Sequence, residues 1–333
     1  MSEAGRRLPV VVIGAGPCGL AAAVALGRAG LDAIVIEKDS VVSSIARYPT
    51  YMTFFSTAEK IAIGGVPFPV AGAKPTRQEA LAYYRRVVVE HALTVRQYEL
   101  VDRVVPEDDW FVVHSKPRGL EPIERRAQAV VFATGYFGTP NRLGVPGEGL
   151  PHVTHFFHEG HEAFQRTALV VGGGNSAVET SLDLCRAGAK VTMVHFGPTF
   201  DKNIKPWVLP DFEARVAAGE IAVRWHARVK AIEPDSVLLN TARGEERVGA
   251  QHVYLMTGYT PRPELLDSLG IRVDAATGVP AHDPSTMETP RRGVFIAGVL
   301  ASGLDANKIF IENGRDHGEL IARALTDAAT RMA

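Results

Sequence analysis

Residues 8–38 read LPVVVIGAGPCGLAAAVALGRAGLDAIVIEK, and this stretch decides the fold. It opens with an unbroken apolar run, which is typical of a strand buried on both faces in a parallel sheet. A Gly-x-Gly-x-x-Gly turn follows, then an apolar helix, a second apolar strand and a closing acid, Glu37. Together these features form the complete dinucleotide-binding pattern. The predicted elements are a strand over 8–13, the turn at 14–19, a helix over 20–29 and a strand over 33–36.

The same arrangement recurs in the second half of the chain. A short apolar strand runs into Gly172-Gly173-Gly174-Asn175-Ser176-Ala177, and a helix and another apolar strand follow this Gly-x-Gly-x-x-Ala turn. Each copy ends in an apolar strand that runs into Thr-Gly-Tyr, at 134–136 and 257–259. This internal repeat predicts an α/β fold with two Rossmann-like dinucleotide-binding domains. The second copy comprises a strand over 168–171, a helix over 178–185 and a strand over 191–194.

Length and composition fit this interpretation. A chain of 333 residues is long enough for two domains, and a net charge of −1 gives no basic field to hold nucleic acid. Only two cysteines are present, which argues against a disulfide scaffold and for a reducing, cytoplasmic compartment. Arg6-Arg7 and the apolar run after them superficially resemble a signal peptide or membrane span, but the glycines within the run suit a tight turn better. We therefore expect no membrane association.

The first turn is expected to bind FAD. Glycines let the backbone approach a pyrophosphate, whose charge then lies on amides at a helix N-terminus. Glu37 ends the second strand, where a carboxylate accepts hydrogen bonds from the ribose hydroxyls of an adenosine diphosphate moiety. This copy comes first, carries the acid and receives the C-terminal part of the chain.

The second turn is expected to bind NADPH in preference to NADH. His195 stands at the same offset from Gly172 as Glu37 does from the first glycine, so no acid repels a 2′-phosphate there. Lys202 and Lys205 follow closely enough to contact that phosphate. No arginine follows His195 directly, because the next residues are Phe196 and Gly197.

The end of the chain is expected to complete the first domain. Residues 293–298 form a short apolar strand, and 308–324 form a helix interrupted near Asn313-Gly314. The FAD-binding domain is then discontinuous and comprises 1–160 and 286–333. The NAD(P)H-binding domain is inserted between them, at 161–285.

The whole chain resembles the thioredoxin-reductase-like flavoproteins, and within them the YpdA-type bacillithiol-disulfide reductases. The segments that carry the resemblance are GAGPCGL (14–20), RYPT (47–50), MTFFST (52–57), GGVPF (64–68), KPTR (74–77) and KIFIENGR (308–315). The resemblance implies an NADPH-dependent flavoprotein that reduces the disulfide of a low-molecular-weight thiol, bacillithiol. Its expected partner is a small-molecule disulfide, and we expect a homo-oligomer.

Two departures refine this implication. A thioredoxin reductase carries a Cys-x-x-Cys pair in the nucleotide domain, and this chain has none, so reduction of thioredoxin through a dithiol is not expected. Many relatives also place an Asp after the Ala-Gly of the last strand to bind the ribityl chain. Val299 stands at that position here, so the ribityl hydroxyls need another partner.

The turns and the resemblance together give two sets of cofactor-binding residues. For FAD they are Gly14, Gly16, Pro17, Cys18, Gly19, Glu37, Lys38, Arg47, Phe54, Ser56, Val101, Thr134, Gly135, Gly298, Lys308 and Ile309. For the nicotinamide nucleotide they are Gly172, Gly174, Asn175, Ser176, Ala177, His195, Lys202, Lys205 and Gly258.

Cys18 is the candidate catalytic nucleophile. It lies at the start of a helix, where the macrodipole and free amides favour the thiolate, so a lowered pKa is expected. The expected cycle has NADPH reduce FAD, the thiolate attack the disulfide, and reduced flavin resolve the mixed disulfide. The alternative is that Cys18 only packs beside the pyrophosphate. Cys185, inside an apolar helix, is expected to be a buried core residue.

Four histidines recur every third position, at 152, 155, 158 and 161. This spacing suggests a metal site, but no Cys or Asp ligands accompany them, and a crossing between domains also gathers polar aromatic residues. We expect no metal.

Two other functions fit the same pattern. A flavin monooxygenase shares the two Rossmann domains and the Ala-Thr-Gly-Tyr strand end, and it forms a peroxyflavin instead of reducing a disulfide. A non-catalytic sensor uses bound flavin only to report the redox state.

Overall fold

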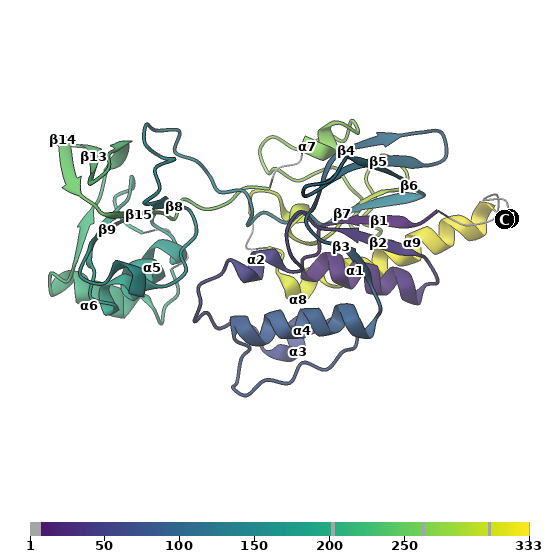
Figure 1. Cartoon of the computed structure of the whole chain (residues 1–333), viewed down its shortest axis with the longest axis horizontal. Coiled ribbons are helices and arrows are strands. Elements are labelled where there is room, and N and C mark those ends of the chain that lie inside the picture. The colour runs from purple at the N-terminus through teal and green to yellow at the C-terminus, as the bar shows by residue number, and fades with distance from the viewer. Residues whose placement is uncertain (1–7, 201–203, 262–263, 306–307, 333) are drawn as a thin grey trace. The chain divides into compact units, whose positions relative to one another are not determined.

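The structure is a computed structural model that describes residues 8–200, 204–261, 264–305 and 308–332. Its contacts divide the chain into two compact units (Figure 1). Unit 1 comprises the described residues of 1–46, 52–139 and 260–333, and unit 2 those of 47–51 and 140–259.

Unit 1 is built on a five-stranded parallel sheet with the order β16-β7-β1-β2-β3. Every residue of the two central strands β1 and β7 is buried, which agrees with a parallel strand covered on both faces. The last strand of the chain pairs with β7, so the C-terminal part returns to the first sheet as predicted. The strands are β1 (Val10–Ile13), β2 (Ala33–Ile36), β3 (Thr94–Arg96), β7 (Ala129–Phe132) and β16 (Val294–Ile296).

Helix α1 lies on one face of this sheet, and a three-stranded antiparallel meander lies on the other (Figure 1). Helix α1 begins three residues before the predicted start because Pro17, which has no N–H to satisfy, occupies its first turn. Helix α9 packs so closely on α1 that a Cβ on Gly318 would lie 2.6 Å from the Ala22 Cα. None of the described helices combines the length and apolarity needed to cross a bilayer.

The remaining elements of unit 1 are short or peripheral. The helices are α1 (Pro17–Arg28), α2 (Ser43–Ala46), α3 (Ala58–Ile61), α4 (Arg77–Glu90), α7 (Glu264–Asp267), α8 (Ile311–Gly314) and α9 (His317–Met332), with a 3₁₀ turn at Gly298–Ser302. The meander comprises β4 (Glu99–Pro106), β5 (Phe111–Pro117) and β6 (Ile123–Ala127).

Unit 2 repeats this plan. Its parallel sheet has the order β11-β10-β9-β15-β8, in which β9 takes the central place that β1 has in unit 1. Its strands are β8 (Val153–Thr154), β9 (Thr167–Val171), β10 (Lys190–Val194), β11 (Ile221–Arg224) and β15 (His252–Leu255). Its helices are α5 (Asn175–Arg186) and α6 (Leu209–Ala217), with a 3₁₀ turn at Gly160–Ala163. Its antiparallel meander is β12 (Arg228–Ile232), β13 (Ser236–Thr241) and β14 (Gly244–Gly249).

The boundaries of unit 2 come earlier in the chain than the predicted 161–285. Residues from Pro140 onward group with unit 2 because β8 pairs with β15. Residues from Thr260 onward group with unit 1, where the Thr139 hydroxyl donates to the Thr260 carbonyl. The Pro- and Gly-rich loops that connect the units have no periodic pattern from which these points could be predicted.

Candidate functional site

The first glycine turn combines glycines required by packing with one that faces open space. A Cβ on Gly14, whose φ is +109°, would collide with the Ala133 carbonyl oxygen, and one on Gly19 would collide with the Gly14 oxygen. Gly16 precedes α1 with an extended backbone, and no atom lies within 4 Å of its Cβ position. The space in front of the α1 amides therefore suits a pyrophosphate, which a side chain at residue 16 would obstruct.

Glu37 lies against this turn as the sequence predicts. Its buried carboxylate accepts hydrogen bonds from the Ala15 N–H at 2.8 Å and the Asp39 N–H at 3.0 Å. The Ser43 hydroxyl donates a third, at 3.3 Å. These donors fix the carboxylate beside the glycines, where a ribose hydroxyl can reach its remaining lone pairs. Ser43 was missed from the sequence because no motif marks it.

Most of the other residues predicted for FAD lie in unit 1. Thr134 and Gly135 follow β7 directly after Ala133, which touches the glycine turn. Val101 is buried in β4, near Glu99, whose N–H donates to the Glu37 carbonyl. Pro17 begins α1, and Lys38 is exposed beside Glu37.

A second group of predicted residues lies near the C-terminal segment of unit 1. Phe54 is buried, and the Ser56 hydroxyl donates to the Glu312 carboxylate. Lys308 is exposed and paired with Asp305 at 3.6 Å, and Ile309 follows it. A crevice of about 470 Å³ is lined by Ser56, Lys60, Phe310, Glu312, Asn313 and Arg315.

Arg47 is grouped differently from these residues. It belongs to unit 2, where its guanidinium lies over the Phe156 ring at 5.7 Å from the centroid. Thr50, in the same segment, donates its N–H to the His158 carbonyl. These contacts connect the segment 47–51 to unit 2.

The expected lowering of the Cys18 pKa is wrong. Burial of the thiol, with the Asp316 and Glu312 carboxylates nearby, raises the pKa of Cys18 to about 12. A Cβ on Gly298 would lie 3.0 Å from the Cys18 Sγ, and one on Gly314 would lie 2.9 Å from it. The sulfur is thus packed between two glycines, and desolvation of the thiolate outweighs the helix dipole.

His317 is a neighbour of this packing that was missed from the sequence. Its Nδ1 accepts the Gly298 N–H at 3.1 Å, so the ring is neutral and carries its proton on Nε2. Burial and the nearby His282 lower the pKa of His317, against an opposing effect of Asp316. The neutral ring therefore holds Gly298, the residue that begins the 3₁₀ turn after β16.

The second glycine turn has the same construction as the first. A Cβ on Gly172, whose φ is +145°, would collide with the Met256 carbonyl oxygen, which follows β15 as Ala133 follows β7. Gly174 is the N-cap of α5, and Asn175, Ser176 and Ala177 form its first turn. Its amides have no side-chain cap and are available to a phosphate. Gly258 follows β15 with a φ of +82°.

His195 occupies the place in this unit that Glu37 has in the first. It is buried, and a Cβ on Gly173 or Gly197 would touch its ring. Trp225 packs edge-on against it, at 6.0 Å between ring centroids. The ribose position of unit 2 therefore has no acid, and the residue there, His195, packs against an aromatic ring.

Of the two predicted lysines, the structure describes only Lys205. The Lys205 Nζ makes an ion pair with Glu179 at 2.8 Å, and the backbone N–H of Lys205 donates to the Asn175 side chain. Its charge is therefore largely neutralised within the protein. Lys202 lies outside the described residues.

An arginine borders the loop after β10. Arg228, the first residue of β12, lies over the exposed ring of Phe196 with its Cζ 4.6 Å from the centroid. The Ala227 N–H donates to the His195 carbonyl, which fixes this strand start beside the loop. Arg228 was missed because it is distant from the motif in sequence and no local signal marks it.

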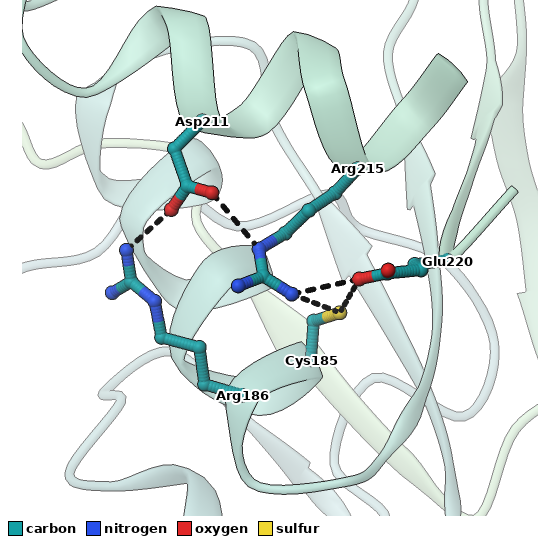
Figure 2. A network of polar contacts seen from close by, with 5 residues as sticks. All are labelled: Cys185, Arg186, Asp211, Arg215 and Glu220. Atoms are coloured by element: carbon teal, nitrogen blue, oxygen red, sulfur yellow. Dashed lines mark hydrogen bonds and ion pairs between the residues drawn. The ribbon is translucent and has the colours of Figure 1, made fainter. Parts of the chain in front are cut away.

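Cys185 lies at the edge of the unit 2 core instead of inside it. The residue is partly buried, and its Sγ lies 3.6 Å from Arg215 Nη1 and 3.7 Å from Glu220 Oε2 (Figure 2). Arg215 also pairs with Asp211, which binds Arg186 (Figure 2). The sulfur therefore faces a charged network, which an apolar helix pattern did not predict.

Two of the four regularly spaced histidines, His155 and His158, have contacts with different partners. His155 Nε2 lies 3.1 Å from Glu148, and the His158 carbonyl accepts the Thr50 N–H. Within the described ranges, no three or more His, Cys, Asp or Glu side chains are grouped to hold a metal ion.

Comparison with known proteins agrees with this geometry. A family model described as pyridine nucleotide-disulphide oxidoreductase matches residues 11–298. The chain is 45% identical over 315 residues to the bacilliredoxin reductase Bdr of Bacillus subtilis (strain 168), covering 94% of this chain and 95% of the relative. The structure of the bacillithiol disulfide reductase Bdr (YpdA) from Bacillus cereus is similar, with a TM-score of 0.93 and 42% identity over 97% of this chain and 100% of that one. The thioredoxin reductase of Lactococcus lactis shares the fold, with a TM-score of 0.75 and 20% identity over 98% of this chain and 100% of that one.

Proposed function

The chain belongs to the pyridine nucleotide-disulphide oxidoreductase family, and from that premise we propose that it uses NADPH to reduce a low-molecular-weight disulfide, bacillithiol disulfide. The reaction consumes one NADPH, one proton and one disulfide, and it yields NADP⁺ and two thiols. The chain is a flavin-dependent enzyme of the thioredoxin-reductase-like class. The names of its relatives support the proposed substrate.

One observation carries the proposal: the two units have matching glycine turns with different residues at the ribose position. In unit 1 this residue is the buried carboxylate Glu37, and in unit 2 it is His195. A carboxylate suits unphosphorylated ribose hydroxyls, whereas a neutral or cationic residue tolerates a 2′-phosphate. This difference supports FAD in unit 1 and NADPH in unit 2.

The residues of the chain then have defined roles. The α1 amides and Gly16 bind the FAD pyrophosphate, and Glu37 orients the adenosine ribose. Bound FAD supplies two-electron transfer between the nicotinamide and the disulfide. In unit 2, Gly174 and the first turn of α5 bind the pyrophosphate of the nicotinamide nucleotide.

The crevice beside Ser56 supports a charged disulfide as substrate. It brings two cations, Lys60 and Arg315, near the carboxylate of Glu312. A polar molecule with both carboxylate and ammonium groups finds a partner for each charge there.

Cys18 remains the proposed nucleophile, under two conditions. Gly298 and Gly314 must move away from its sulfur, and the thiol must lose a proton that its pKa of about 12 retains at neutral pH. If these conditions are not met, electrons pass to the disulfide without a protein thiolate.

The proposal is tested by anaerobic titration of the purified FAD-loaded protein. NADPH should bleach the flavin faster than NADH, and bacillithiol disulfide should restore the colour more efficiently than glutathione disulfide or cystine. A folded protein that cannot be loaded with FAD would refute the proposal. Rapid NADPH oxidation in air with a long-lived oxygen adduct, and no response to disulfides, would favour a monooxygenase.

The same titration on Cys18→Ala tests the nucleophile. The variant should retain FAD that NADPH reduces but should fail to turn over disulfide. Normal turnover would show that Cys18 only packs between the glycines.

A further inference from the structure

Three cations of unit 2, Lys205, Arg224 and Arg228, contact the second turn or the loop that follows β10, or lie in strands that do. The Lys205 N–H donates to Asn175 in the turn, and the Arg224 carbonyl accepts the His195 N–H. Arg228 lies directly on Phe196, the residue after His195.

Two of these cations are already neutralised by carboxylates. Lys205 pairs with Glu179 at 2.8 Å, and Arg224 Nε lies 2.8 Å from Glu246. In the part of the chain that the structure describes, no carboxylate pairs with Arg228. Arg228 therefore keeps the charge that a dianionic ligand would need.

Among the residues that the structure describes, none forms a hydrogen bond or ion pair with the Arg228 guanidinium, whose Cζ lies 4.6 Å from the centroid of the Phe196 ring. A guanidinium over an aromatic ring uses its flat face, whereas its N–H groups point outward in the plane of the group. Those N–H groups match two oxygens of a phosphate. Phe196 is 58% exposed, so the ring that carries the guanidinium is itself open to a ligand.

We infer that Arg228, held on Phe196, binds the 2′-phosphate and sets the preference for NADPH over NADH. The inference rests on the proposed function only in placing a nicotinamide nucleotide at the second turn. The phosphate is bound by an arginine from β12, since no arginine stands directly after His195, where the residues are Phe196 and Gly197. Phe196 acts as a positioning residue for Arg228.

The test measures nucleotide binding without turnover. Adenosine 2′,5′-bisphosphate and AMP are titrated by calorimetry into the FAD-loaded protein, whose first site is filled. Arg228→Met should weaken the bisphosphate at least about tenfold and change AMP binding less than about twofold, because only the bisphosphate carries the contacted group. Arg243→Met is the matched control, since Arg243 is an exposed arginine of the same unit in the turn between β13 and β14.

Two further variants separate the roles. Phe196→Leu should reduce the ratio of the affinity for the bisphosphate to the affinity for AMP. Arg228→Lys should keep more of this ratio than Arg228→Met does.

Each contrary result has a defined meaning. If Arg228→Met keeps the wild-type ratio, or if wild type does not distinguish the two nucleotides, the inference is wrong while NADPH reduction of the flavin stands. If neither NADPH nor NADH reduces the flavin of wild type, it is the proposed function that fails.

Discussion

At the scale of single residues, Cys18 has a role in packing that does not depend on its reactivity. Its sulfur fills the space that a Cβ on Gly314 would need, at 2.9 Å. We expect Gly314→Ala to lower the free energy of unfolding by about 1–3 kcal/mol, because overpacking a rigid site forces neighbours apart. Urea unfolding of the FAD-loaded protein measures this change.

The double variant Cys18→Ala/Gly314→Ala shows whether the loss of stability in Gly314→Ala comes from a clash with the sulfur or from a loss of backbone flexibility. Removing the sulfur should relieve the clash. The free energy of unfolding of the double variant should therefore be higher, by about 1 kcal/mol or more, than the sum of the two single effects predicts. Strict additivity would contradict the packing described for Cys18.

His317 makes stability depend on pH. Because its pKa is lowered in the folded protein, the unfolded chain takes up this proton at a higher pH than the folded one. The stability that the neutral His317 ring contributes is fully present above the ordinary histidine pKa of about 6.5. It is lost as the pH falls through that value towards the lowered pKa of the folded protein. The free energy of unfolding should therefore be smaller at pH 5 than at pH 7.5.

His317→Asn isolates this effect, since an asparagine oxygen can accept the Gly298 N–H without titrating. The variant should lose less stability than wild type over the same pH range, although His155 and His252, whose pKa values burial also lowers, keep part of the slope. His226→Asn, at an exposed histidine, serves as the control. Equal slopes in wild type and His317→Asn would refute this prediction.

Residues could be predicted from the sequence where a local motif fixes their surroundings. Glu37 lies against the Ala15 amide because strand, turn and strand are contiguous, and His195 has the matching position in the repeat. The surroundings of Cys18 and Arg228 come from segments far along the chain, Gly298 and Gly314 for one and Phe196 for the other. No local pattern contains that information, so the pKa of Cys18 was predicted in the wrong direction.

At the scale of elements, the start of α4 depends on a reciprocal cap. The Thr76 side chain accepts the Glu79 N–H at 3.2 Å, and the Glu79 carboxylate accepts the Thr76 N–H at 2.8 Å. Thr76→Ala should cost about 1 kcal/mol of stability, because it leaves a helix N–H without its partner. Thr57→Ala is a suitable control, since Thr57 precedes α3 without a cap bond from its side chain. Equal losses in the two variants would contradict the cap.

Elements with strong periodicity were predicted well, and their ends less so. The predicted strand over 33–36 coincides with β2, and the predicted break near Asn313-Gly314 separates α8 from α9. Helix α5 begins at Asn175, three residues before the prediction, because the glycine turn itself supplies the first helical turn. The two meanders were not predicted, since their strands alternate weakly and face solvent on one side.

At the scale of the whole molecule, the two units should respond to different ligands. Loading with FAD should slow amide hydrogen exchange at 15–19 and around Glu37, and adenosine 2′,5′-bisphosphate should slow it at 174–177 and 195–197. Each ligand stabilises the unit that binds it, by about 2.7 kcal/mol at a hundred times its Kd. Mass spectrometry of exchanged peptides checks this, and protection of 15–19 by the bisphosphate in the FAD-loaded protein would reverse the assignment of the units.

The return of β16 to the first sheet has a consequence for how the protein is made. A nascent chain leaves the ribosome from its N-terminus, so residues 140–259 emerge before residues 294–296 do. The second unit can close its sheet at that moment, whereas the first lacks both its last strand and the helix that covers α1. Translation that stops early therefore releases a half-finished molecule with an open β7 edge, which is a substrate for chaperones and proteases.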